Sequence, residues 1–297
     1  MTTGRRAVLA ALAGGVLAGC AGPRSATSGA TSGPPAVPAL NAAPAPNATA
    51  DAPPSAPSAT APAIPRAEIV ARYRHAVPRS WGFDGPGVVH ALPKGKREIA
   101  LTFDACGGPG GSGYDQPLID FLRKREIPAT LFINSRWIEA NPSLFRRLAA
   151  EPLFEIANHG TRHRPLSVTG RSAYGIPGTR DAGEVYDEIA GNRAELTRLL
   201  GAPPHFFRSG TAYCDDVAAR IVTDLGERFA SFSVNGDGGA TFTPEQVRTT
   251  VASAPGGSIV ICHMNHPEGG TAQGIAAAVP KLLARGHTFV RLSDAVH

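Results

Sequence analysis

Short apolar runs and longer amphipathic segments alternate along most of the chain. Seven runs carry the aliphatic, β-branched and aromatic residues typical of buried strands. They cover 99–104, 129–134, 153–158, 205–208, 229–234, 258–263 and 287–291. Between them, apolar residues recur at helical spacing, and Gly or Pro closes most of these segments, as at Leu200-Gly201 and Leu225-Gly226. The pattern therefore predicts seven strand-then-helix units.

Such repeated units favour a parallel sheet whose crossovers are helices. Seven of them predict an α/β fold, a distorted seven-stranded (β/α) barrel that forms a single domain over 66–297. In barrels of this kind the reacting groups lie at the carboxyl ends of the strands. Polar residues at strand ends are therefore the candidates for chemistry.

The segment 20–65 cannot build a core of its own. Ala, Pro, Ser, Thr and Gly make up most of it, and its larger aliphatic residues are only Val37, Leu40 and Ile64. These are too few to offset the entropy of ordering so many residues. We expect a disordered, partly extended Ala/Pro/Ser linker.

The first 19 residues have the pattern of an export signal. Arg5 and Arg6 precede an apolar run over 7–18, which is too short for a transmembrane helix of about 20 residues. The Leu-Ala-Gly-Cys ending resembles the bacterial lipoprotein processing site, which implies that Cys20 carries lipid. We expect an exported protein anchored to the cell envelope membrane through Cys20, on the periplasmic or extracellular face. An ordinary secretory signal cleaved elsewhere is the alternative.

The net charge and the cysteine content exclude one class of partner and limit the number of disulfides. The formal net charge of +5 comes without a long Lys/Arg run, a zinc-finger spacing or a nucleic-acid fingerprint, so nucleic acid is not an expected partner. Beyond Cys20 the chain has Cys106, Cys214 and Cys262. Because three is odd, at most one internal disulfide can form, and at least one thiol stays free, buried or bound as a ligand.

Polar residues follow five of the predicted strands. They are Asp104, His159, Arg208, Asp237 and His263. Period-2 alternation puts Asp104 on the same strand face as Ala100 and Thr102, which favours an inward direction. A metal-assisted site would have these residue types at one rim.

His159 and His163 form a His-x-x-x-His pair. Pro165 follows closely and disfavours helix before it, so the pair lies on a strand-to-loop transition. Two neutral imidazoles suit Zn²⁺ or a similar divalent metal, which needs one carboxylate and an open water position to be catalytic. The alternative is a surface loop with two solvated histidines.

Four motifs carry a family resemblance. They are LTFDACGG at 101–108, NHGTRHRP at 158–165, FFRSG at 206–210 and ICH at 261–263. In this order and at strand ends, they resemble the polysaccharide deacetylase family, the NodB-homology domain. The resemblance implies a distorted seven-stranded (β/α) barrel that removes acetyl groups from glycans with a divalent metal. It also implies a role for each residue: catalytic base for Asp104, metal ligands for His159 and His163, orientation of the base for Arg208, and general acid for His263.

The first motif departs from the family pattern. Ala105 stands where the family usually has the aspartate that binds the metal. Either Asp104 itself binds the metal, with the base role passing to a carboxylate such as Asp237, or one of Asp115, Asp237 and Cys106 completes the metal shell. The residues alone do not choose between these alternatives.

We therefore expect a zinc-dependent hydrolase that removes acetyl groups from an N-acetylated cell-envelope or extracellular polysaccharide. Catalysis would fall to Asp104, His263 and Arg208, and metal binding to His159, His163 and Asp104. Two alternatives are a non-catalytic glycan-binding relic of the fold, which Ala105 motivates, and a metal-independent amidohydrolase acting on small cyclic amides. The Gly-rich segment 165–182 is either a substrate lid with Tyr174 or Arg171 touching sugar, or a solvated insertion.

Overall fold

The computed structural model describes residues 64–93 and 97–297. All of them belong to one compact unit. The predicted signal peptide over 1–19, the lipid-bearing Cys20 and nearly all of the predicted linker over 20–65 lie outside the described residues. Within the described ranges, no helix has both the length and the apolar character needed to cross a membrane.

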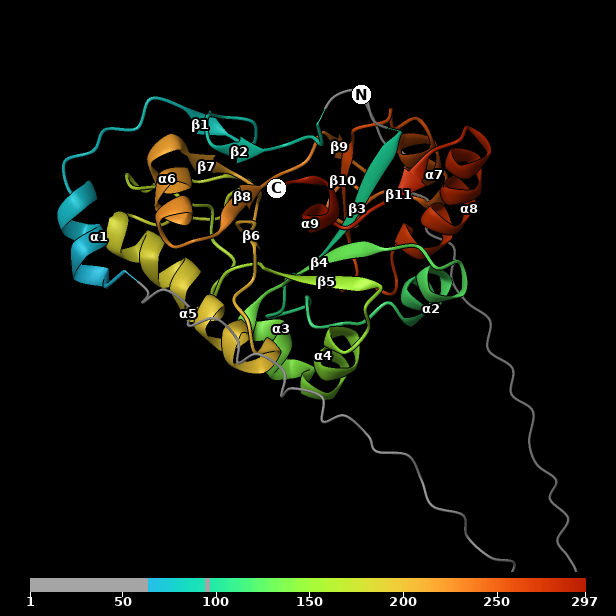
Figure 1. Cartoon of the computed structure of the whole chain (residues 1–297), viewed down its shortest axis with the longest axis horizontal. Coiled ribbons are helices and arrows are strands. Elements are labelled where there is room, and N and C mark those ends of the chain that lie inside the picture. The colour runs from blue at the N-terminus through green and yellow to red at the C-terminus, as the bar shows by residue number, and fades with distance from the viewer. Residues whose placement is uncertain (1–63, 94–96) are drawn as a thin grey trace, which may run out of the picture. The chain divides into compact units, whose positions relative to one another are not determined.

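A curled parallel sheet is the centre of the described unit (Figure 1). Its nine strands are β2 (Val88–Val89), β3 (Glu98–Ala105), β4 (Ala129–Ile133), β5 (Phe154–Asn158), β6 (Phe206–Phe207), β8 (Arg228–Ala230), β9 (Val234–Asn235), β10 (Ile259–His263) and β11 (Thr288–Phe289). The order is β2-β8-β6-β5-β4-β3-β10-β9, and β11 pairs with the start of β3. All seven predicted strands are present, which confirms the distorted α/β barrel. The additional strands β2 and β9 end the sheet, and the barrel is open between them in the part of the chain that the structure describes.

Helices cover the outer face of the sheet. They are α1 (Arg66–Tyr73), α2 (Gln116–Lys124), α3 (Ser135–Ala140), α4 (Pro142–Ala149), α5 (Ala182–Leu200), α6 (Asp216–Asp224), α7 (Pro244–Ala252) and α8 (Thr271–Ala284). The short α9 (Leu292–Ala295), near the C-terminus, instead packs against the inner face of the sheet through Leu292 and Ala295. Aspartate side chains cap α2, α5 and α6 by accepting a backbone N–H of the first turn. In Figure 1, α1, α5 and α6 gather beside β6 and β8, whereas α2, α7 and α8 lie beside β3 and β10.

The alternation of side chains along β3 separates the core from the site. Leu101, Phe103 and Ala105 are buried in the large outer cluster with the helices, whereas Ala100 belongs to a smaller cluster on the inner face. Asp104 lies on that inner face, as the period-2 pattern predicts, because successive side chains of a strand point to opposite sides.

Neighbouring strands bring the candidate residues together. His263 at the end of β10 pairs in register with Asp104 of β3, and Asn158 at the end of β5 pairs with Phe207 of β6. His159 and Arg208 follow directly. Because all these strands are parallel, their carboxyl ends form one edge, and this edge carries the site.

Candidate metal-binding active site

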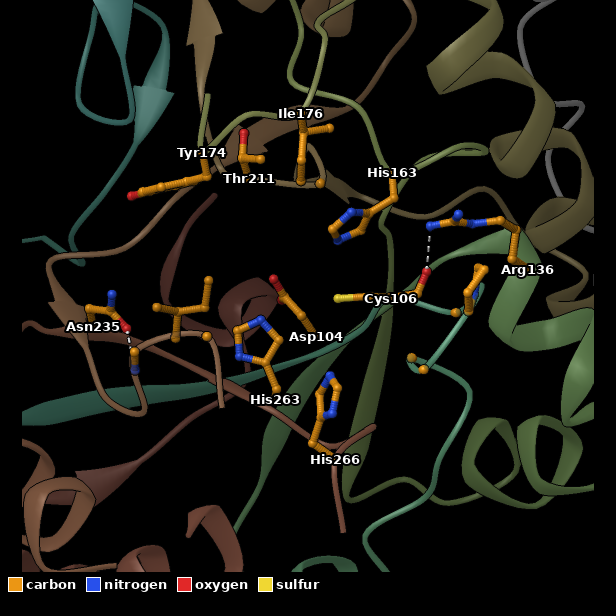
Figure 2. Close-up of a pocket in the computed structure, with 18 of the residues that line it drawn as sticks. Asp104, Cys106, Arg136, His163, Tyr174, Ile176, Thr211, Asn235, His263 and His266 are labelled. Carbon is orange, nitrogen blue, oxygen red and sulfur yellow. Dashed lines mark hydrogen bonds between the residues drawn. The ribbon is translucent and has the colours of Figure 1, made fainter. Parts of the chain in front are cut away.

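A cavity of about 690 Å³ opens at the carboxyl edge of the sheet (Figure 2). Strand ends supply its floor, and the segments after β3, β4, β5, β6, β8, β9 and β10 supply its walls. The side chains that line it include Asp104, Cys106, Arg136, His163, Tyr174, Ile176, Thr211, Phe232, Asn235, Ile261, His263 and His266. A concave site with a few convergent polar groups is the usual form of a catalytic pocket.

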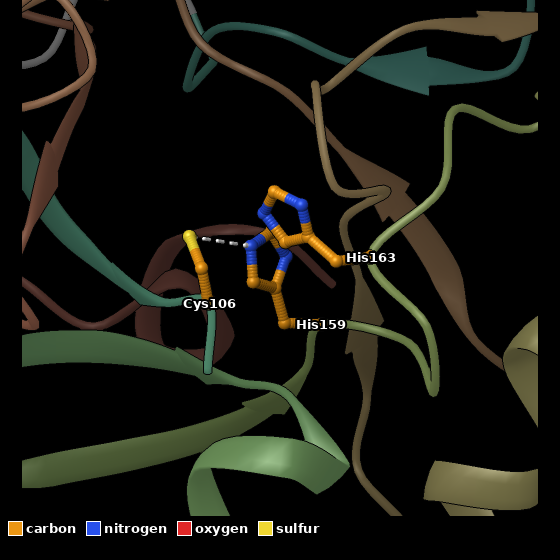
Figure 3. Close-up of side chains that lie close together, drawn as sticks. All are labelled: Cys106, His159 and His163. Atoms are coloured by element: carbon orange, nitrogen blue, oxygen red, sulfur yellow. Dashed lines mark hydrogen bonds between the residues drawn. The ribbon is translucent and has the colours of Figure 1, made fainter. Parts of the chain in front are cut away.

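Cys106, His159 and His163 form a compact group of side chains that could hold a metal ion (Figure 3). Their ligand atoms all lie within 4.8 Å of one another, and Cys106 Sγ is 3.7 Å from His159 Nε2. Ligand atoms around a tetrahedral zinc ion are separated by about 3.4 to 3.6 Å, from the bond lengths to sulfur and nitrogen. The three side chains therefore fit such an ion with a small inward adjustment, and they leave a coordination position for water.

A backbone contact selects the tautomer of His159. Its Nδ1 donates to the carbonyl of Arg208 at 3.0 Å, so the neutral ring has its lone pair on Nε2, the atom that faces Cys106, and Nε2 donates to Cys106 only when the ring is protonated. A histidine ligand of a metal is commonly oriented in this way by a carbonyl on its other nitrogen.

The loop with both histidines needs an unusual backbone. Gly160 has φ of 77° and His163 φ of 62°, both in the left-handed region. A Cβ on Gly160 would lie 2.5 Å from Glu188 Oε1. The same buried Glu188 carboxylate accepts the backbone N–H groups of Arg162 and Arg164. Glu188 thereby holds the turn that aims His163 at the group.

The environment of Cys106 favours the thiolate. Burial on its own would raise the pKa of the Cys106 thiol. The charge of His163 and hydrogen bonds from His159, His163 and His263 outweigh burial and hold this pKa well below its ordinary value. The thiolate is the form that binds a metal.

Asp104 and Arg208 form a fully buried ion pair. Arg208 Nη1 donates to Asp104 Oδ1 at 2.7 Å. The same guanidinium donates to the carbonyls of Ala230 and Ser231 and to Thr102 Oγ1, and these hydrogen bonds fix its orientation. The second carboxylate oxygen, Oδ2, lies 3.6 Å from His159 Nε2 and faces the metal-binding group.

His263 is paired with a buried carboxylate. Its Nδ1 donates to Asp237 Oδ1 at 3.0 Å, and its backbone N–H donates to Asp237 Oδ2 at 2.6 Å. Thr271 Oγ1 also donates to this carboxylate. Burial lowers the pKa of His263, but the charge and hydrogen bond of Asp237, with a contribution from Cys106, raise this pKa well above its ordinary value.

The structure brings together all five site residues that the sequence predicts: Asp104, His159, His163, Arg208 and His263. The residues that the sequence offers as a third metal ligand have different surroundings in the structure. Cys106 joins the two histidines, whereas the Asp237 carboxylate is engaged by His263. Asp115 caps α2 through Leu118 N–H.

Other residues around the site have structural roles or lie at the rim. Trp137 is fully buried and donates to the carbonyl of Gly113, and His266 lines the cavity and pairs with Glu268. Cys106, Cys214 and Cys262 are all free thiols. Sequence reasoning missed the role of Glu188, and no sequence signal distinguishes this residue from other acids on an amphipathic helix.

Comparison with known proteins gives one family. The model of the polysaccharide deacetylase family matches residues 91–230. The peptidoglycan-N-acetylmuramic acid deacetylase PdaA of Bacillus subtilis is 21% identical over 207 residues, which cover 67% of this chain and 71% of the relative. These matches confirm the predicted resemblance and the predicted class of enzyme.

Solved structures share the fold. A CE4 family pseudoenzyme from Bacillus anthracis superposes with a TM-score of 0.60 at 18% identity, covering 72% of this chain and 70% of that one. A family 4 acetyl xylan esterase from Clostridium thermocellum, solved with a cobalt ion, has a TM-score of 0.54 at 21% identity and covers 67% of this chain and 89% of that one. Because both an esterase and a pseudoenzyme share this fold, the residues of the site must decide whether catalysis occurs.

Proposed function

We propose that the chain is a metal-dependent hydrolase that removes acetyl groups from an N-acetylated polysaccharide of the cell envelope, and its match to the polysaccharide deacetylase model over residues 91–230 supports this proposal. One observation carries this proposal. A Cys-His-His group, a buried Asp-Arg pair and a buried Asp-His pair face one cavity, although they come from distant parts of the sequence.

We assign metal binding to Cys106, His159 and His163, with Cys106 rather than Asp104 as the third ligand. A thiolate with two imidazoles suits zinc, whose catalytic sites keep three protein ligands and an open position. A bound ion of this kind supplies a water of lowered pKa and polarises the acetyl carbonyl. Asp104 stays outside the ligand set because Arg208 holds one of its oxygens.

Asp104 is then free to act as the general base. Its Oδ2 faces the metal-binding group and can accept the proton of the attacking water, while Arg208 orients the carboxylate by a charge-assisted hydrogen bond. Arg208 has no surface in the cavity, so it is a positioning residue.

His263 is the general acid in this mechanism. Its pairing with Asp237 favours the imidazolium and leaves the other ring nitrogen to give a proton to the departing sugar amine. The proposed acid and base therefore come from the adjacent strands β10 and β3, where His263 and Asp104 are in register.

The proposed substrate and location follow from the relatives and the N-terminus together. The PdaA relative is named for peptidoglycan, a polymer outside the cytoplasmic membrane. An export signal over 1–19 and a lipid anchor at Cys20 would bring this chain to the same compartment, with the linker as a tether.

The test combines metal content, spectroscopy and turnover. Purified protein should retain about one equivalent of zinc and should deacetylate N-acetylated glycan oligomers, as followed by mass spectrometry. Cobalt-substituted protein should show a sulfur-to-cobalt charge-transfer band that disappears in Cys106→Ser. Cys214→Ala is the matched control, because Cys214 is another free, buried thiol outside the site, and it should keep the band and the activity.

Ala105 favours a second candidate function, a non-catalytic glycan-binding relic. In that case the protein would bind acetylated oligomers without turnover, whether or not metal is added. Turnover that survives complete metal removal and the His159→Ala substitution would instead favour a metal-independent amidohydrolase.

A further inference from the structure

Tyr174 is a large aromatic side chain that is exposed at the rim of the cavity. It keeps 75% of its surface accessible, whereas most large apolar side chains of the described residues are buried. The other large apolar side chains with high exposure in the described ranges, Val77 and Leu283, do not line the cavity. The exposed ring is therefore located at the place where a substrate would enter.

The loop that carries Tyr174 is well anchored. Ala173 and Ile176 exchange two backbone hydrogen bonds across the tip, at 3.2 and 2.9 Å. Tyr174 itself has φ of 52°, a conformation that non-glycine residues seldom adopt. At the base of the loop, Thr179 Oγ1 donates to the carbonyl of Ser167 and accepts the Ser167 N–H, both at 2.7 Å. These contacts hold a strained tip at a defined place, which favours a role beyond that of a solvated insertion.

Tyr174 packs against a cluster of aromatic rings. Its ring meets Tyr213 edge to face, with centroids 5.5 Å apart. Tyr213 contacts Trp81 and Phe83 in turn, at 5.7 and 5.5 Å. The Arg171 guanidinium, from the same loop as Tyr174, lies over the Trp81 ring at 5.0 Å. The ring of Tyr174 thus packs on a neighbour, Tyr213, that is itself held by further contacts, and such support before binding lowers the entropy cost of binding.

The cavity extends beyond the reacting groups. In Figure 2, Tyr174 and Asn235 lie at one end and Arg136 at the other, with Cys106 and His263 between them. Phe232 also lines the cavity and stacks on Phe83, the ring that supports Tyr213. A sugar placed at the reacting groups therefore leaves room for a neighbouring sugar near Tyr174.

We propose that Tyr174 is the platform of a sugar-binding subsite next to the deacetylation centre, and that the substrate is an oligomer or polymer of pyranose sugars. This inference rests on the proposed function. The C–H-rich face of a pyranose packs on an aromatic face. The subsite contributes to binding and specificity and takes no part in proton transfer.

The experiment compares Tyr174→Leu, which removes the ring but keeps an apolar side chain, with Tyr174→Phe, which keeps the ring. Val77→Ala is the control at an exposed apolar position outside the cavity. Each variant is assayed on N-acetylglucosamine and on its β-1,4-linked oligomers of increasing length. We expect Tyr174→Leu to raise KM for the oligomers about tenfold, with kcat and the KM for the monomer unchanged. Tyr174→Phe and Val77→Ala should match the wild type to within about twofold.

An unchanged oligomer KM in Tyr174→Leu, or an equal rise for monomer and oligomer, would overturn the inference. If the wild type deacetylates none of these sugars, the proposed function fails for this substrate class. Calorimetric titration of the same oligomers into the wild type and Tyr174→Leu then tests the subsite separately. Tighter binding of long oligomers that is lost in Tyr174→Leu supports the subsite, and equal or absent binding in both proteins refutes it.

Discussion

Replacement of Asp237 by asparagine should shift the alkaline limb of the pH–activity profile. Asp237 accepts two hydrogen bonds from His263, at 3.0 Å from the ring and at 2.6 Å from the backbone. A hydrogen bond to a charged group contributes about 1.5 to 3 kcal/mol, which equals about 1 to 2 pKa units for the group whose charge it favours. The Asp237→Asn variant should therefore have a His263 pKa lower by about that amount.

The direction of this shift follows because Asp237 stabilises the protonated form of His263. Asp237 raises the pKa of His263, so the imidazolium persists to higher pH and its stabilisation is lost as pH rises through the folded-state pKa. In Asp237→Asn the general acid loses its proton earlier, and the upper limb of a plot of kcat/KM against pH should move to lower pH by about 1 to 2 units.

Thr271→Ala is the control for this experiment. It removes a neutral hydrogen bond to the same carboxylate and leaves the charge in place, so its upper limb should stay where the wild type has it. Thermal unfolding of both variants shows whether the fold is retained. A folded Asp237→Asn variant with an unmoved upper limb would refute the assignment of His263 as an acid tuned by Asp237.

Three further predictions concern the same site. Gly160→Ala should lower the free energy of unfolding by about 1 to 3 kcal/mol, because the new Cβ would be at positive φ and would also meet Glu188. Denaturant titration with metal analysis should show that stability and metal content fall together. An unchanged free energy of unfolding and metal content would contradict the role given to this turn. Arg208→Met should destabilise the protein by about 3 to 5 kcal/mol, because it leaves the Asp104 charge buried without a partner, and urea unfolding measures this loss. Zinc should dissociate as pH falls, because protons compete with the ion at His159 Nε2. Burial lowers the pKa of His159, but Asp104 and Cys106 raise this pKa on balance. Equilibrium dialysis against a chelator across pH measures zinc retention, and retention that does not depend on pH would exclude His159 as a ligand.

The regular part of the fold is readable from the sequence because each strand of the barrel carries its own apolar run. Strands such as β4 and β10 are long enough to show this pattern. The strand β2 lies in no predicted run, and β9 starts at Val234, the last residue of the run 229–234 that also contains most of β8. Their existence depends on the neighbouring strands, which a local pattern cannot reveal.

The site residues can be predicted from the sequence for a related reason. Asp104, His159, Arg208 and His263 each end or follow a strand, so the parallel sheet brings them to one edge whatever their separation in sequence. The sequence leaves the third ligand open because Ala105 breaks the family motif. The alternation of β3, continued by one position, would have favoured Cys106, since residues 102, 104 and 106 share a face while Ala105 belongs to the outer core.

The register between β3 and β10 has a consequence for how such a protein can change over evolutionary time. Asp104 and His263 are opposite each other on hydrogen-bonded strands, so ladder spacing sets the separation of the two proton-transferring groups. The loop bearing Tyr174 can then lengthen, shorten or exchange its aromatic tip while this separation stays constant. New glycan preferences are accessible by loop replacement alone, and a grafting experiment on 165–182 would draw on the same freedom.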